Sequence, residues 1–515
     1  MGTGISVLIP TAALAVAAWI QDPSLVDAVR SRDANVASML AGKVDANEAA
    51  PDGTTPLHWA VYHGDVDLVR TLIGLGADVH AVNDYGSTPM SEAALVGSTP
   101  ILESLLEAGA DVESPNADGQ TALMVVARSG NTDAARLLLD RGADVNAVER
   151  FRGQTALMWA AARSQPEMVR ELIARGADVG ARSMVNGWER QVTGEPRAIY
   201  RPAGGLTPLL YAAREGCVEC ARHLVEAGAD LEMTDPEGVT PLIMSVWNAH
   251  FDTAGYLLEA GADPNNWDWW GRTPLYLAVD YNTIPHGGRP DQPSLDATTS
   301  LEIIEMLIDA GAYPNPQLKL LPPYRSVGAD RGADGMLTIG TTPLLRAAKA
   351  LDAPAIGLLL AAGARPDIPN SRGVLPITAA AGMGSRDGDT RGWLTTSDAE
   401  ARSIASLALL LDAGDDPNAT AGQGGQTLLH GAVTRGWSDL VRFLVARGAD
   451  INQADSQGLT PLDTALGRAA SGRGGPAPVQ EATAAVIREL GGVEGTPVEA
   501  PPLGPGGRGG RGGGQ

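Results

Sequence analysis

A Thr-Pro-Leu motif recurs along this chain every 33 residues. It begins at Thr207, Thr240 and Thr273, and a Gly-Ala-Asp turn follows the first two copies at the same offset. A fixed period of this length is typical of a stacked array of small structural units. Because each unit contacts only its neighbours, we expect the 515 residues to form a continuous array rather than several globular domains.

The Pro of each motif, or the residue that replaces it, marks about twelve copies. The marks are Pro23, Pro56, Pro89, Ala122, Ala156, Pro208, Pro241, Pro274, Pro343, Pro376, Leu428 and Pro461. Longer intervals indicate a copy plus an insertion, and they place insertions near residues 181–205, 282–299, 314–340, 384–396 and 470–480. The first and third of these insertions lengthen a connector equally, with 32 residues in place of 13 between its Gly and the next mark. Their strand-like residues predict two β-hairpin fingers, and simple loop drift is the alternative.

One copy explains the residue types. Thr55 is suited to cap a helix that starts at Pro56, where no intrahelical N–H partner is lost. Leu57 and Ala60 form an apolar stripe, and Leu68, Val69, Leu72 and Ile73 have the spacing of a second helix with one buried face. Such a pair of helices cannot bury both faces alone, so neighbouring pairs must stack.

The motif Thr55-Pro56-Leu57-His58-Trp59-Ala60 resembles the ankyrin repeat signature, and residues 427–432 match it apart from the Pro. The resemblance covers about residues 22–492. It implies an all-α solenoid of antiparallel helix pairs with projecting hairpin loops, which binds partners on its concave side. Where Ser91, Met124, Leu210 and Thr378 replace the motif's His, we expect a side-chain hydrogen bond to be lost.

The two ends differ from the array at residues 21–492. Residues 1–20 include an apolar run, residues 5–20, that is too short to span a bilayer. Small residues at Ala13, Ala15 and Ala17 fit an export-peptidase site, although no basic residue precedes the run. We expect a cleaved signal for export from a bacterial-type cell, to the periplasm or outside; an uncleaved anchor and a cytoplasmic cap are the alternatives. Residues 493–515 are rich in Gly, Pro and Arg and predict a disordered tail.

An aromatic cluster marks the candidate binding site. Residues 265–271 read Asn-Asn-Trp-Asp-Trp-Trp-Gly, where other copies carry Asp, Pro, Arg or Glu. Exposed Trp residues are unfavourable for solubility and favourable for binding. A second variable loop tip lies near residue 151. The residues that we predict to contact a partner are Trp247, Trp267, Trp269, Trp270, Tyr281, Phe151 and Arg152. The alternative is that these rings form a small local core beneath the insertions.

Other chemistry is weakly signalled. Cys217 and Cys220 are half of a zinc motif without a second half, so we expect structural thiols, with a local disulfide as the alternative if the chain is exported. No metal, cofactor or catalytic group is indicated. A formal charge of −23 argues against nucleic acid and membrane surfaces. The sequence therefore predicts a non-enzymatic, monomeric scaffold that binds another protein. An envelope-associated array, or a small-ligand or sugar site at the Trp-rich loop, is the alternative.

Overall fold

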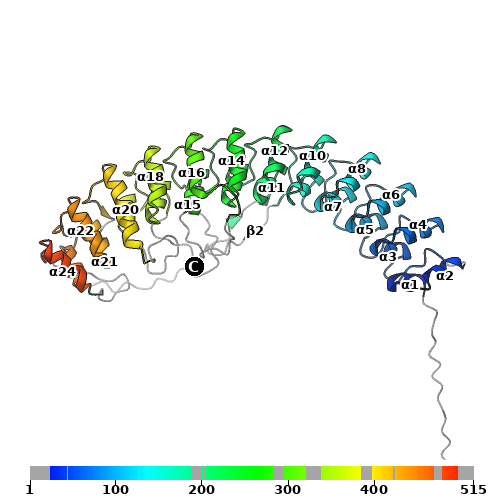
Figure 1. Cartoon of the computed structure of the whole chain (residues 1–515), viewed down its shortest axis with the longest axis horizontal. Helices are drawn as coiled ribbons and strands as arrows, with labels where there is room; N and C mark the ends of the chain where they lie inside the picture. The colour runs from blue at the N-terminus through cyan, green and yellow to red at the C-terminus, as the bar shows by residue number, and fades with distance from the viewer. Residues whose placement is uncertain are drawn as a thin grey trace, which may run out of the picture. The chain divides into compact units, whose positions relative to one another are not determined.

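The computed structural model describes residues 24–42, 45–186, 189–190, 199–200, 203–282, 294–320, 338–383, 397–421, 424–468 and 478–496. The chain divides into two compact units, Met1–Phe151 and Arg152–Gln515. Within each unit the helices form pairs, and the pairs follow one another in sequence order (Figure 1). The many helices and few short strands confirm the predicted all-α class of stacked helix pairs.

The first unit contains four helix pairs among the described residues. They are α1 Leu25–Ser31, α2 Val36–Ala41, α3 Pro56–Tyr62, α4 Val66–Gly74, α5 Pro89–Val96, α6 Thr99–Glu107, α7 Ala122–Ser129 and α8 Thr132–Asp140.

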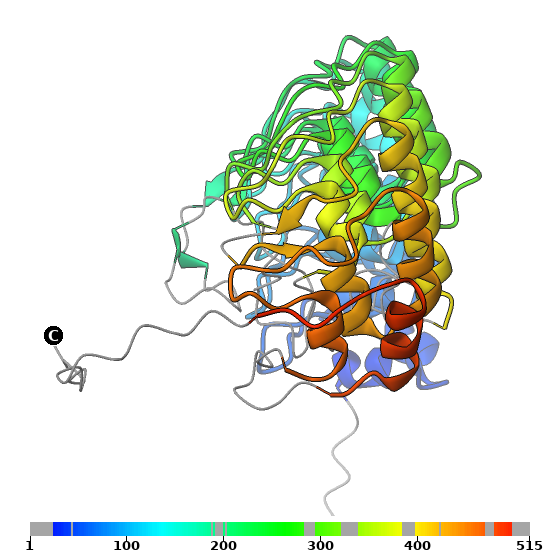
Figure 2. The same cartoon turned by 90° about the vertical axis from the view of Figure 1, so that its left-hand side faces the viewer.

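The second unit continues the pattern and adds short strands. Its helices are α9 Ala156–Ala161, α10 Pro166–Ala174, α11 Pro208–Glu215, α12 Val218–Glu226, α13 Pro241–Trp247, α14 Phe251–Glu259, α15 Pro274–Asn282, α16 Ser300–Asp309, α17 Pro343–Lys349, α18 Ala353–Ala361, α19 Pro376–Ala380, α20 Ala399–Asp412, α21 Leu428–Arg435, α22 Ser438–Ala446, α23 Pro461–Ala465 and α24 Glu481–Glu489. Its strands are β1 Val185–Asn186, β2 Glu189–Arg190, β3 Ile199–Tyr200, β4 Ala203–Gly204, β5 Thr420–Ala421 and β6 Gln426–Thr427. Figure 2 shows the helices of this unit in two columns, with the connectors gathered at one side.

The helix starts follow the predicted caps. Every mark from Pro56 onward is the first residue of a helix. At most of these starts the preceding Thr accepts a hydrogen bond from a backbone N–H of the first turn, as Thr240 Oγ1 does from Ile243 N at 3.2 Å. Leu375 and Thr427 do not make this bond. The first copy departs from this rule, because α1 begins two residues after Pro23 and is capped by Ser24.

The residues that replace the motif's His correct one expectation. His58 Nδ1 accepts from Thr55 N at 3.2 Å, and its Nε2 donates to the Ser87 carbonyl oxygen of the next copy at 3.1 Å. Ser91 Oγ still accepts from the N–H of its capping residue at 2.9 Å, and Thr378 Oγ1 does so at 3.2 Å. The capping bond is therefore kept in these two copies, because a short hydroxyl side chain reaches the same backbone N–H.

Each pair is held by apolar side chains from both of its helices. Leu57 and Ala60 of α3 and Val69 and Leu72 of α4 are buried, as the spacing predicted. The alanine has no side chain beyond Cβ, so the next pair can approach closely. Burial of these faces against neighbouring pairs supplies the main stabilising free energy, because single short helices are marginal in water.

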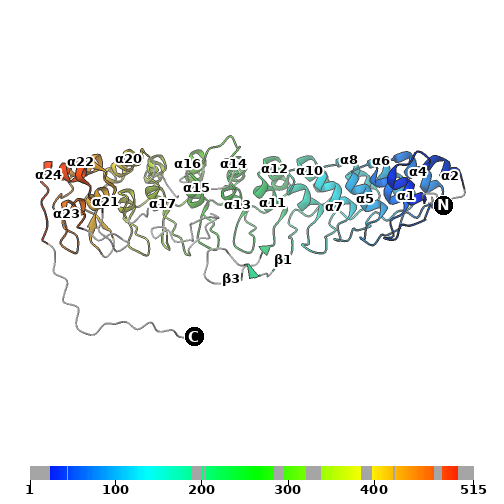
Figure 3. The ribbon, with the colours of Figure 1, turned by 90° about the horizontal axis from the view of Figure 1, so that it is seen from below.

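The first lengthened connector forms the predicted hairpin. Val185 pairs with Gly204 in one antiparallel ladder and Glu189 with Tyr200 in the other, and both keep one register. Figure 3 shows β1 and β3 on the connector side of the helices. For the second finger only the base is described, where Leu318 N donates to Thr341 O at 3.1 Å and Gly340 N donates to Leu318 O at 2.8 Å.

Several predicted segments lie outside the described residues. They are the leader at residues 1–20, nearly all of the tail at 493–515, all of the insertion at 384–396 and most of those at 282–299, 314–340 and 470–480. Among the helices that the structure does describe, none combines the length and the apolar character needed to cross a bilayer.

Candidate functional site

The Trp connector, defined as residues 265–272 between α14 and α15, is built around one carboxylate. Asp268 accepts hydrogen bonds from the backbone N–H groups of Trp270 at 3.0 Å and Arg272 at 2.9 Å. Its other oxygen forms an ion pair with the Arg272 guanidinium, with both Nε and one terminal nitrogen at 2.6 Å. Both side chains are buried. Two nitrogens of the planar guanidinium approach the same carboxylate oxygen, and the backbone bonds occupy the other, so the turn is held tightly.

Two indole rings enclose the guanidinium of this ion pair. The Arg272 Cζ atom lies 4.4 Å from the centre of the Trp247 ring and 4.7 Å from that of Trp270. The two rings meet edge to face at 6.5 Å. We call Trp247, Asp268, Trp270 and Arg272 the buried cluster. A desolvated cation between two aromatic faces stabilises the base of the connector.

The other two Trp residues of the connector point outward. Trp267 is 55 % exposed and Trp269 is 62 % exposed, and we call this pair the tip. The ammonium group of Lys319, which belongs to the next connector, lies 3.9 Å from the centre of the Trp267 ring. The tip thus presents two large amphipathic side chains to solvent within a three-residue stretch.

Backbone hydrogen bonds to both neighbouring connectors hold the tip. Trp269 N donates to Glu237 O at 2.8 Å, and Lys319 N donates to Trp270 O at 2.8 Å. Gly271 adopts a φ of +80°, and a Cβ at this position would lie 2.9 Å from Lys319 N, so the close approach requires glycine. The tip is therefore fixed from below by the buried cluster and from both sides by its neighbours.

The structure separates the residues that were predicted to contact a partner. Trp270 is only 2 % exposed and Trp247 is half-buried. Trp270 thus departs from the exposed set, because the turn around Asp268 directs its ring onto Arg272. Both rings pack on Arg272 and on each other, and their contact with a partner stays a prediction.

The remaining predicted residues belong to other parts of the chain. Tyr281 packs edge to face on Phe251, with ring centres 5.1 Å apart, and its hydroxyl accepts from Ser294 N at 3.3 Å. Phe151 is exposed at the end of the first unit. Arg152 is exposed at the start of the second unit, where its carbonyl oxygen accepts from Met184 N at 2.6 Å.

Sequence reasoning missed the contribution of Lys319. A signal was present, because Lys319 follows Gly311 at the same offset at which Trp269 follows Gly261. Because an insertion follows Lys319, the equivalence is not seen when positions are counted backward from Pro343, the next repeat mark.

The two cysteines form a disulfide, so the expectation of free structural thiols is corrected. Cys217 and Cys220 are bonded across the first turn of α12, where Cys217 also serves as the cap and accepts from Cys220 N. The local disulfide, which was the alternative expected for an exported chain, is the arrangement observed. Among the described residues there is no group of His, Cys, Asp and Glu that would hold a metal ion.

A second polar group lies between α15, α17 and α18. Arg346 is fully buried and its Nε lies 2.6 Å from Asp280 Oδ1. Nearby, Asn282 Nδ2 donates to Asp352 Oδ2 at 2.5 Å. Burial raises the pKa of Asp352, against the lowering effect of the Asn282 hydrogen bond. This arrangement joins consecutive helix pairs through buried polar side chains and so supports the stack.

Comparisons with known proteins agree with the fold. Residues 25–116, 92–183 and 191–268 match a family model described as ankyrin repeats (3 copies), and residues 410–465 match one described as ankyrin repeats (many copies); together they cover more than half of the chain. An ankyrin repeat-containing protein of Schizosaccharomyces pombe is 44% identical over 70 residues, which is 14% of this chain and 32% of that protein. The chain therefore spans about a third of the length of that relative. The ankyrin repeat domain of human ASB11 aligns over 47% of this chain and 99% of its own length, with 22% identity and a TM-score of 0.39.

Proposed function

This chain belongs to the ankyrin repeat family, and we propose that it is a scaffold without enzymatic activity that binds another protein through the tip of its Trp connector. Ankyrin repeats generally mediate protein–protein interaction. The observation that carries the choice of site is the exposure of Trp267 and Trp269 on a connector whose base is buried and ion-paired.

The physical reason is the rigidity of the tip. Trp is one of the residues enriched among interface positions that dominate binding free energy. A loop that is already held in one conformation loses little conformational entropy when a partner binds. The acidic balance of −23 supports a protein partner over nucleic acid or an anionic membrane.

We further propose that the protein acts after export. The apolar leader supports this, and so does the disulfide between Cys217 and Cys220, because disulfides persist in oxidising compartments outside the cytosol. Cell fractionation with N-terminal sequencing of the mature chain tests it. Recovery of the intact leader in the cytosol would contradict it.

Affinity capture from the native cell tests the site. The bait is the wild-type chain or the double variant Trp267→Ala/Trp269→Ala, with Tyr85→Ala as the control, because Tyr85 is an equally exposed aromatic residue in the first unit. The double variant should bind partners held by the tip at least about 30-fold more weakly, since hot-spot Trp residues contribute ~2 kcal/mol or more. It should therefore capture less of them. Equal capture by all three baits would remove the tip as the site. Capture of no specific partner by any bait would favour the envelope-associated array.

A further inference from the structure

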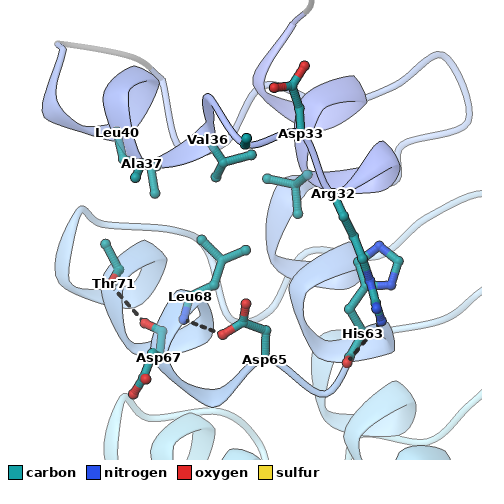
Figure 4. A pocket seen from close by; sticks show the side chains of 12 residues that line it. Arg32, Asp33, Val36, Ala37, Leu40, His63, Asp65, Asp67, Leu68 and Thr71 are labelled. Atoms are coloured by element: carbon teal, nitrogen blue, oxygen red, sulfur yellow. Dashed lines mark hydrogen bonds between the residues drawn. The ribbon is translucent and has the colours of Figure 1, made fainter.

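Helix α12 is capped by a sulfur atom, where equivalent helices of other copies are capped by oxygen. In α4 the capping residue is Asp65, whose carboxylate accepts from Leu68 N at 3.0 Å; Figure 4 shows this bond at the edge of a cleft of about 820 Å3 between α2 and α4. Helix α8 is capped in the same way by the side chain of Asn131. In α12 it is the Cys217 Sγ atom that accepts, from Cys220 N at 3.2 Å.

The strength of this cap depends on the oxidation state of Cys217. In the disulfide with Cys220 the sulfur is neutral and accepts a hydrogen bond only weakly. A thiolate in the same place would carry a negative charge beside the first N–H groups of a nine-residue helix, where the helix dipole stabilises anions. Because the reduced form gains a stronger cap, the position favours reduction of the disulfide.

The covalent bond is not needed to bring the two cysteines together. Residues three apart on one helical turn are neighbours whether or not they are bonded. Closing so short a loop removes little entropy from the unfolded chain. Cys220 is also fully buried in the core of its helix pair, and this packing does not depend on the disulfide. Reduction should therefore leave α12 in place.

The two sulfur atoms differ in their access to solvent. Cys217 is 8 % exposed, whereas Cys220 has no exposed surface. Glu219, the acidic residue of the first turn, forms an ion pair with Arg222 at 3.5 Å, so its charge opposes an approaching anion less than an unpaired carboxylate would. A small thiolate can therefore reach the sulfur of Cys217 but not that of Cys220.

We propose that Cys217 and Cys220 form a reversible redox site that exchanges with small thiols of the glutathione class. The thiolate of one small thiol attacks Cys217 Sγ, the bond to Cys220 breaks, and Cys220 leaves with the electron pair and takes up a proton. A second small thiolate attacks the small-thiol sulfur of the mixed disulfide, forms the oxidised small disulfide and releases Cys217 as a thiolate. Two small thiols thus supply the two electrons that reduce the protein disulfide.

Redox titration of the full wild-type chain tests the proposal. The chain is equilibrated in mixtures of reduced and oxidised glutathione, free thiols are alkylated, and mass spectrometry measures the reduced fraction of the pair. Hydrogen exchange of α12 is followed in the same samples, with α8 as the internal control.

The pair should be reduced by millimolar glutathione and reoxidised when the oxidised form is added, while exchange in α12 changes by less than about tenfold. A disulfide that is reduced only in urea would be a fixed structural bond and would overturn the proposal. Failure to reoxidise, or loss of protection in α12 on reduction, would overturn it as well.

Two single-cysteine variants test which sulfur reacts. Cys220→Ala leaves Cys217, and Cys217→Ser leaves Cys220; the two replacements are the residues that other copies carry at these positions, Ala134 and Ser98. Once native exchange in α12 has been confirmed, Cys220→Ala should form a mixed disulfide with oxidised glutathione at least about tenfold faster than Cys217→Ser. Equal rates, or faster reaction at Cys220, would refute the assignment of Cys217 as the attacked sulfur.

Discussion

Separate alanine variants of Trp270 and Trp269 test the division of the Trp connector into an inner and an outer part. The two residues are adjacent in sequence, yet Trp270 is 2 % exposed and Trp269 is 62 % exposed. Trp270→Ala should lower the free energy of unfolding of this part of the array by ~3–5 kcal/mol, the usual range for a buried Trp. It removes the edge-to-face contact with Trp247 and one of the two rings against Arg272. Trp269→Ala should stay within ~0.5 kcal/mol of wild type, as surface substitutions usually do.

Local hydrogen exchange measures this difference most directly, because repeat arrays open segment by segment rather than in one transition. The relevant peptides cover α14 and α15, which flank the connector, and α4 in the first unit serves as the control. A loss of 3–5 kcal/mol corresponds to an increase in exchange of about two to three and a half orders of magnitude. Urea unfolding followed by circular dichroism should show the same order of stability.

Comparable exchange in the two variants would refute the reasoning. In that case the ring of Trp270 would contribute no more to the fold than the ring of Trp269, and the tip would lack the rigid base on which the proposed binding depends.

Three further predictions concern charge and redox state. Asp268→Asn should lower the free energy of unfolding by ~3–5 kcal/mol, because it leaves the Arg272 charge buried without its partner. Asp367→Asn, which breaks an exposed ion pair, should lower it far less. Equal losses for the two variants in urea unfolding would contradict the account. Burial raises the pKa of Asp415 to about 6, since this carboxyl occupies a position where other copies bury an Ala. The folded chain thus opposes ionisation of Asp415, and the free energy of unfolding falls as the pH rises from about 4 through 6. Asp415→Ala should therefore raise the thermal midpoint more at pH 8 than at pH 4, and an equal rise at both would exclude this cause. Reducing the disulfide between Cys217 and Cys220 with a dithiol should lower the free energy of unfolding by at most ~2 kcal/mol, because the bond closes a very short loop. A larger loss in urea unfolding would argue against a purely local role of the disulfide.

The parts of the fold that the sequence predicted are those with local causes. A Thr cap and a Pro in the first helical turn act within four residues, so helix starts such as Pro56 and Pro241 follow directly from the repeat. The first hairpin finger was also predictable, because the strand-like pair Ile199 and Tyr200 lies in an insertion of suitable length. The loss of capping at Ser91 was predicted wrongly, because a serine hydroxyl reaches the same backbone N–H as the longer histidine ring does.

The candidate site was harder to predict, because its geometry depends on contacts between distant residues. The direction of each Trp ring follows from the turn around Asp268, and a run of three nearby indoles gives no indication of which one turns inward. The approach of Lys319 to Trp267 joins two connectors that are separated by a helix pair and an insertion. Helix α2 buries none of its residues and leaves an open cleft beside α4, and residue types alone do not reveal this.

The most direct test of the proposed function is the dissociation constant of a captured partner, measured for wild type and for Trp267→Ala/Trp269→Ala. Hydrogen exchange on both proteins checks that the double variant is folded like wild type. We expect the double variant to keep native exchange in α14 and α15 and to bind at least about 30-fold more weakly. Unchanged affinity in the folded double variant would contradict the claim that the tip is the binding surface.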